Sequence, residues 1–131
     1  MNRNTALFLN KFTTFMVLLN TYVASFPSHE KFALTQEIRN KSYSILNYFT
    51  ETSLRKNKTT ALNNLNIAHE QLRSLLMVAH ALGYFGYHRG TNMGDEHNTK
   101  RYVRISERVD ELGRLIGGWI KKMNDSEGRS D

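Results

Sequence analysis

The 131-residue sequence contains no cysteine, only one proline and no long apolar run. Without cysteine the chain can form neither disulfides nor thiolate metal sites; it is compatible with a reducing cytosol, and we expect a cytoplasmic protein. The single proline, Pro27, predicts a break between two helical segments, because the residue before a proline is pushed out of helical geometry. No segment approaches about 20 consecutive apolar residues, so no membrane-spanning helix is predicted.

Recognisable catalytic motifs are missing as well. The sequence has no phosphate-binding glycine loop, no HExxH zinc motif and no nucleophile motif. His69 and His80 lie near an apolar helix face, where a lone histidine is usually satisfied by local hydrogen bonds. Asp110 and Glu111 are adjacent, so their side chains point in different directions and do not form an acid–base pair. We therefore predict no enzyme activity, no cofactor and no bound metal.

Basic side chains outnumber acidic ones by 18 to 12, which gives a formal net charge of +6. This balance favours a polyanionic partner, either nucleic acid or an anionic membrane surface. The alternative is a basic protein that has no such partner. A length of 131 residues predicts one domain, long enough to bury a core without covalent cross-links.

An apolar pattern at helical spacing runs through residues 102–122. Apolar residues separated by three and four positions form one stripe, made of Tyr102, Ile105, Val109, Leu112, Ile116 and Trp119. Such a stripe is the surface by which a helix packs against other helices. Gly117 and Gly118 could end this helix, but Trp119 and Ile120 keep the apolar period, so we predict that it continues. Gly113 and Gly117 are four residues apart and leave one side bare, where another segment can come close.

Apolar residues at helical spacing predict three earlier helices, over about residues 4–25, 28–54 and 59–85, before the fourth over about 99–122. Ser28 is predicted to cap the second helix, and Phe32 to contribute to its apolar face. Four amphipathic helices with short links are typical of an all-α, antiparallel up-down four-helix bundle. We expect a single domain over residues 1–125 and a disordered tail over residues 126–131.

The apolar residues 12–24 admit a second interpretation. Arg3 precedes them and Val23-Ala24-Ser25 resembles a cleavage site, as in a signal peptide. Asn10 and Lys11 lie inside what would be the apolar region and argue against it. We favour a buried first helix.

Residues 86–98 contain three glycines and predict a flexible loop. A metal hypothesis rests on four residues in it, His88, Asp95, Glu96 and His97. The corresponding enzyme would use His80, His88 and the loop carboxylates. No pair of these residues has convincing ligand spacing, so a solvated loop is the favoured interpretation.

Three segments resemble the signatures of a small bacterial four-helix-bundle family. Residues 26–34, FPSHEKFAL, resemble FP-x-x-[ER]-[KR]-[FY]-x-L, and residues 70–76, EQLRSLL, resemble E-x-LR-x-LL. Residues 109–121, VDELGRLIGGWIK, resemble the closing signature [VL]DE[IL]GRMLGGW[IL]K. The resemblance covers about residues 8–122. Two features depart from the pattern: residues 86–99 are longer than the usual connection, and Thr35 stands where glycine is frequent.

This family includes proteins encoded in intervening sequences of large-subunit ribosomal RNA genes. It also includes Avd, the accessory variability determinant of diversity-generating retroelements, which residues 80–84, HALGY, resemble more closely. The Avd resemblance implies a non-catalytic homopentamer with a basic, barrel-like surface. Its implied partners are the reverse transcriptase of the retroelement and RNA or DNA of any sequence, with no membrane. Its implied role is to support mutagenic cDNA synthesis that diversifies a target gene. The alternative is a ribosomal RNA insertion protein with an unspecified interaction role.

Candidate nucleic-acid contacts lie on the fourth helix. Arg101, Arg104 and Arg108 are helically spaced and share a face. We predict that they bind nucleic acid together with further basic residues, Arg73, Arg114, Lys121 and Lys122. For two of these residues the alternative is an ordinary helix ion pair, Arg108 with Glu111 and Arg114 with Asp110.

The oligomer contacts are predicted at one end of the bundle. Leu115 and Ile120 lie beside the apolar stripe, and together with Trp119 they should stay partly uncovered. In a ring each subunit offers one patch to a different patch of its neighbour. Five copies at +6 each would carry +30, which predicts binding to nucleic acid that falls steeply with salt.

Overall fold

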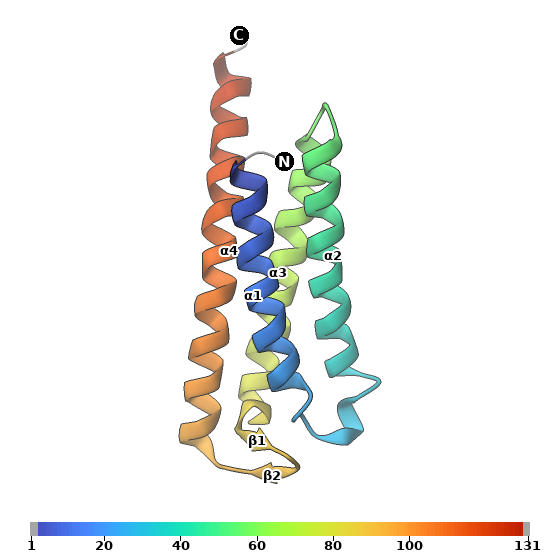
Figure 1. Ribbon diagram of the computed structural model, residues 1–131, viewed down its shortest axis with the longest axis vertical. Helices are drawn as coiled ribbons and strands as arrows, with labels where there is room; N and C mark the ends of the chain where they lie inside the picture. Colours follow the sequence, from blue (N-terminus) through green and yellow to red (C-terminus); the bar gives the residue numbers. More distant parts are fainter. Residues whose placement is uncertain (1–2, 130–131) are drawn as a thin grey trace.

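The computed structural model describes residues 3–129, most of which form four long α-helices (Figure 1). These helices are α1 (Arg3–Val23), α2 (Leu34–Leu54), α3 (Thr59–Ala81) and α4 (Asp95–Arg129). Successive helices run in opposite directions along one axis, so the predicted up-down four-helix bundle is confirmed. α3 packs against both α2 and α4, and α1 packs against α4.

One hydrophobic core fills the space between the four helices. Each helix contributes side chains at helical spacing, and the largest fully buried ones include Phe8, Phe15, Leu19, Ile38, Ile45, Leu65, Leu72, Leu76, Ile105, Leu112 and Ile116. Burial of each such side chain stabilises the fold by roughly 1.5–3 kcal/mol, so the spacing of apolar residues decides which faces meet. The predicted stripe of α4 is confirmed, with Tyr102 and Trp119 half-buried at its two ends.

The first helix is buried in this core, as predicted. Phe8, Phe12 and Phe15 are each at most 4% exposed. None of the helices within residues 3–129 combines the length and the apolar composition that crossing a membrane requires.

The chain between α1 and α2 is less helical than predicted. Residues 28–30 form a short 3-10 helix, η1 (Ser28–Glu30), and α2 begins only at Leu34. No side chain caps the start of α2, so the predicted capping role of Ser28 is wrong. Phe32 lies in the intervening turn and is 82% exposed, so its assignment to the apolar face is wrong too. An aromatic residue at this position resembles a core residue in the sequence, because the sequence does not show the turn that places it at the surface.

The segment predicted to be a flexible loop, residues 86–98, is instead folded. It contains the end of a 3-10 helix and two short antiparallel strands, namely η2 (Tyr84–Gly86), β1 (Tyr87–His88) and β2 (Thr91–Asn92). Arg89 and Gly90, between the strands, have φ angles of 49° and 82°. Positive φ at both central positions is what a two-residue hairpin turn requires. Of the three glycines, Gly90 lies in the hairpin turn, Gly86 ends η2, and Gly94, with a φ of 96°, lies in the connection to α4.

Helix α4 is longer than predicted at both ends. It has 35 residues, roughly 52 Å at 1.5 Å per residue, whereas the other helices have 21 to 23 residues. It begins at Asp95, where Asp95 and Glu96 place negative charge in the first turn and favour a helix start. It runs through Gly117 and Gly118, as predicted, and projects beyond the other helices (Figure 1).

The predicted disordered tail, residues 126–131, is therefore wrong for residues 126–129, which are helical. Residues 130–131 lie outside the described residues. Apolar residues at helical spacing end at residue 123, so the sequence pattern does not indicate that the helix continues to residue 129.

Candidate nucleic-acid interface

The first arginine of the predicted strip, Arg101, is held against its own bundle. Its guanidinium donates a hydrogen bond to the Tyr87 carbonyl at 3.2 Å and lies 3.3 Å from Nδ1 of His88. The same group stacks over the ring of Tyr22, 5.1 Å from its centroid. Arg101 thus joins α4 to the hairpin and to α1, so its removal would change the fold as well as the charge.

The other two arginines of the strip differ from each other. Arg104 is exposed and forms no ion pair within residues 3–129. Arg108 is half-buried and pairs with Glu111 at 3.5 Å, as the alternative interpretation expects. The helical spacing is confirmed, but of these three arginines only Arg104 is both exposed and free of an ion pair.

Four basic side chains of α4 are both exposed and free of ion pairs in the described part of the chain. Arg73 of α3 is not comparable, because it pairs with Asp110 at 2.5 Å and with Glu70 at 3.8 Å. The Asp110–Arg114 pair considered from the sequence does not form, since the Asp110 carboxylate contacts α3 instead. The exposed, unpaired residues are Arg104, Arg114, Lys121 and Lys122, which we call the α4 cations.

Glu111 links α4 to α1, and its carboxylate pairs with one cation from each of these helices. Its carboxylate accepts a hydrogen bond from Lys11 Nζ at 3.0 Å and pairs with Arg108. The hydrogen bond from Lys11, followed by the charges of Lys11, Arg108 and Arg114, holds the pKa of Glu111 below its usual value despite partial desolvation. An ionised Glu111 therefore offsets one of the two positive charges that it faces on this flank of the helix.

The histidines have packing contacts. His69 is buried and its Nε2 lies 2.8 Å from the Val109 carbonyl, so the prediction of a locally satisfied histidine is confirmed for it. The His80 ring stacks on Tyr102 with centroids 4.1 Å apart. Between residues 3 and 129, no three histidine or carboxylate side chains come together in a way that could hold a metal ion. The loop residues proposed as ligands, His88, Asp95, Glu96 and His97, thus do not converge on a site.

The three residues predicted to contact a neighbouring subunit are half-buried. Trp119 packs against Phe8 and Phe49, with ring centroids 5.4 and 5.8 Å away. Leu115 and Ile120 also pack on the core while keeping part of their surface exposed. The partly uncovered apolar end is present in the fold, and the subunit contact itself stays a prediction.

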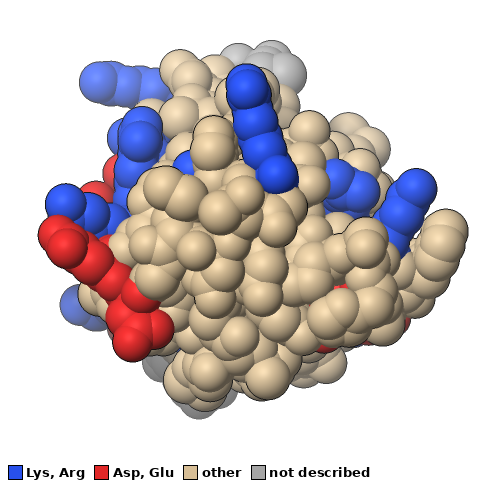
Figure 2. Space-filling model, turned by 90° about the horizontal axis from the view of Figure 1, so that it is seen from below, with Lys and Arg blue, Asp and Glu red and all other residues tan. Residues whose placement is uncertain are grey.

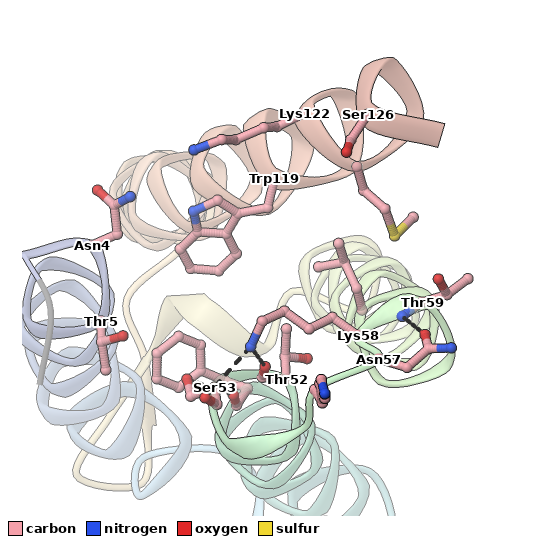
Figure 3. A pocket seen from close by; sticks show the side chains of 14 residues that line it. Asn4, Thr5, Thr52, Ser53, Asn57, Lys58, Thr59, Trp119, Lys122 and Ser126 are labelled. Carbon is pink, nitrogen blue, oxygen red and sulfur yellow. Dashed lines mark hydrogen bonds between the residues drawn. The ribbon is translucent and has the colours of Figure 1, made fainter. Parts of the chain in front are cut away.

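A cleft of about 750 Å³ opens beside Trp119, at the end where α4 projects (Figure 3). Its polar rim includes Lys56 and Lys58, from the connection between α2 and α3, and Lys122 from α4. Among the described side chains that line it, none is a carboxylate. The sequence analysis did not predict this cleft, because residues 55–58 form a polar, basic connection whose neighbours in space the sequence does not show. The fold alone brings them to Trp119.

The opposite end of the bundle carries the hairpin and is mostly uncharged (Figure 2). Lysine and arginine side chains lie mainly around its margin, and acidic side chains gather on one side of it. Exposed apolar side chains of the segments at this end include Phe32 at 82% and Met93 at 55% exposure.

The fold and its surface define a basic four-helix-bundle protein. Within that class, the chain belongs to the bAvd-like family, whose family model matches residues 6–123. The family resemblance seen in three sequence segments is thereby confirmed, and the matching family is Avd-like. A search of curated proteins and a search of solved structures each found no match.

Proposed function

We propose that this protein is a non-catalytic accessory protein of a diversity-generating retroelement. In this role it binds template RNA or cDNA, binds the reverse transcriptase of the element, and supports mutagenic reverse transcription of a target gene. The observation that carries the proposal is membership of the bAvd-like family over residues 6–123. That match includes all three segments in which the sequence resembles Avd.

The charge distribution supports nucleic acid as a partner. The net charge is +6, and the α4 cations lie along one helix without internal ion pairs. Cations that are free of carboxylates release counterions from phosphates when they bind, which gives affinity with little sequence preference. Arg73 and Arg108 contribute less, because each already faces a carboxylate.

The proposed assembly is a homopentameric ring. Leu115 and Ile120, which do not line the Trp119 cleft, supply a partly uncovered apolar patch, and a ring forms when such a patch meets a different patch on each neighbour. Light scattering on a sizing column measures the solution mass directly. A pentamer has a mass near 76 kDa, five times 15.2 kDa, whereas a 15.2 kDa species contradicts the ring.

Reconstitution with the polymerase tests the function. The reverse transcriptase encoded nearest to this gene is purified with and without this protein, and cDNA synthesis on its template RNA is measured. We expect a stable complex and cDNA that depends on the accessory protein. Equal synthesis in its absence contradicts the proposal. So does a gene that lies inside a ribosomal RNA gene, with no reverse transcriptase and no template and variable repeats nearby.

A further inference from the structure

The cleft beside Trp119 combines an aromatic floor with a cationic rim. In Figure 3 the indole extends from α4 into the space between the helices, with Lys122 above it and Lys58 on its other side. One side of the ring packs near-parallel to Phe49, at an interplanar angle of 28°. Phe49 is 4% exposed, so it fixes the indole from below. Trp119 itself is only half-buried and lines the opening.

The lysines around this floor face no opposing charge. Lys56 and Lys122 are exposed and form no ion pair within the described chain, and the cleft lining contains no Asp or Glu. Lys58 is held in place, because its Nζ donates to the Thr52 carbonyl at 2.5 Å. A second, longer hydrogen bond joins Nζ to the Ser53 carbonyl at 3.5 Å, so one of the three N–H donors of this ammonium group is left for a ligand. Three cations without a carboxylate favour an anionic ligand.

Size and hydrogen-bonding groups narrow the choice of ligand. A volume of about 750 Å³ lies in the range of small-molecule sites and admits one nucleotide. Asn57 accepts a hydrogen bond from the Thr59 N–H through Oδ1 at 3.2 Å, which leaves its amide N–H groups for a base edge. The half-buried indole lines the cleft, where its accessible part can stack on any base, and lysines bind the phosphates on either side.

We infer that this cleft binds an unstacked nucleotide of single-stranded nucleic acid, with the base on Trp119 and flanking phosphates on Lys56, Lys58 and Lys122. A base inside a duplex is stacked and paired, so the cleft selects single strands over duplexes. The inference rests on the proposed function, since it assumes that nucleic acid is a partner. It adds a defined site, remote from the hairpin end, where an RNA end or loop is held.

The single tryptophan of the chain makes the inference directly measurable. Trp119 is the only tryptophan, so intrinsic fluorescence reports this cleft alone. The full-length protein is titrated with a single-stranded oligoribonucleotide of about ten nucleotides, within the usual site size. An abasic oligomer and a duplex of equal length are the comparison ligands. Total binding is followed separately by the anisotropy of labelled RNA.

The expected result is saturable quenching of Trp119 by the single strand, with the same midpoint as the anisotropy change. The duplex and the abasic oligomer leave the fluorescence unchanged. The abasic oligomer also binds about tenfold more weakly, because stacking on an aromatic side chain is lost. RNA binding without quenching, or equal quenching by the abasic oligomer, overturns the inference while the proposed function stands. Absence of any RNA binding overturns both.

A matched pair of variants tests the lysines. Lys56→Gln with Lys122→Gln removes two exposed cations of the cleft, whereas Lys31→Gln with Arg89→Gln removes two exposed cations at the hairpin end. We expect the first pair to move the quenching midpoint to higher RNA concentration. It should also reduce the salt slope by about 1.4, at 0.7 per phosphate contact of a single strand. The second pair leaves the extent of quenching unchanged. Equal effects of the two pairs on quenching contradict a site in the cleft.

Discussion

The imidazole of His69 occupies the space that a side chain at Gly113 would need. A Cβ at position 113 would lie 2.8 Å from Cε1 of His69, closer than real Cβ contacts. His69 Nε2 is placed there by its contact with the Val109 carbonyl, 2.8 Å away in the same turn of α4. The glycine within the closing DELGR segment thus allows α3 to bring a buried histidine against the backbone of α4.

This contact predicts opposite effects of alanine at two glycines of one helix. Gly113→Ala should lower the free energy of unfolding by about 1–3 kcal/mol, because the clash with His69 outweighs the better helix propensity. Gly117→Ala should raise it by about 0.5–1 kcal/mol, since nothing lies within 4 Å of a Cβ there. Urea unfolding at one fixed protein concentration measures both. Stabilisation by Gly113→Ala would show that His69 moves aside without cost.

The Lys11–Glu111 pair predicts a pH-dependent contribution to stability. A lowered pKa of Glu111 means that its ionised form is favoured in the folded state. The stabilisation is therefore complete above the ordinary value of 4.5 and is lost as pH falls through the lower folded-state pKa. Lys11→Met should cost less than about 1 kcal/mol at pH 7, because both side chains are partly exposed, and close to nothing at about pH 2. Equal costs at both pH values would contradict this link between α1 and α4.

Tyr84 and Glu30 form the corresponding link at the hairpin end. The Tyr84 hydroxyl donates to the Glu30 carboxylate at 2.7 Å, and this hydrogen bond, with burial and the carboxylate charge, raises the pKa of Tyr84 to about 12. A raised tyrosine pKa stabilises the fold fully below pH 10, and this contribution is lost as pH rises toward 12.

Ultraviolet titration of the six tyrosines should therefore show one phenol that ionises last. Glu30→Gln should return that phenol toward an ordinary pKa, whereas the control Glu37→Gln, in the first turn of α2, should not. A wild-type protein in which all six phenols ionise together would contradict the contact.

Thr35, where the family often has glycine, has a buried hydroxyl whose removal should stabilise the fold. The residue is 4% exposed and its Oγ1 has no hydrogen-bond partner within residues 3–129. Thr35→Val keeps the shape and removes a buried unsatisfied group, so we expect about 1 kcal/mol of stabilisation. The control Thr50→Val, at an exposed position, should change stability by less than about 0.5 kcal/mol. A destabilised Thr35→Val protein would mean that the hydroxyl is satisfied in solution.

The bundle could be predicted because its apolar residues repeat locally. Ile105, Val109, Leu112 and Ile116 give the buried face of α4 from spacing alone. The segments between the helices could not be predicted in this way. The hairpin has strands of only two residues, too short for an alternating pattern, and its turn is signalled only by Arg89-Gly90.

The site could be predicted only in part. Spacing placed Arg101, Arg104 and Arg108 on one face, but it could not show that Arg101 is bound by Tyr22 and His88, which come from other elements. The Trp119 cleft was missed for the same reason, because Lys56 and Lys58 are 60 or more positions away in sequence. Charge pairing across helices is decided by the fold, not by local sequence.

The most direct test of the account is the salt dependence of RNA binding, measured by anisotropy over a range of salt concentrations. One variant replaces three unpaired cations, Arg104, Arg114 and Lys121, by glutamine. Its control replaces three paired ones, Arg55, Arg73 and Lys100, whose charges already face carboxylates. We predict a steep wild-type slope that falls by about 2 in the first variant, at 0.7 per lost phosphate contact, and clearly less in the control. A wild-type affinity that does not change with salt, or an equal loss in both variants, would contradict a nucleic-acid-binding surface on α4.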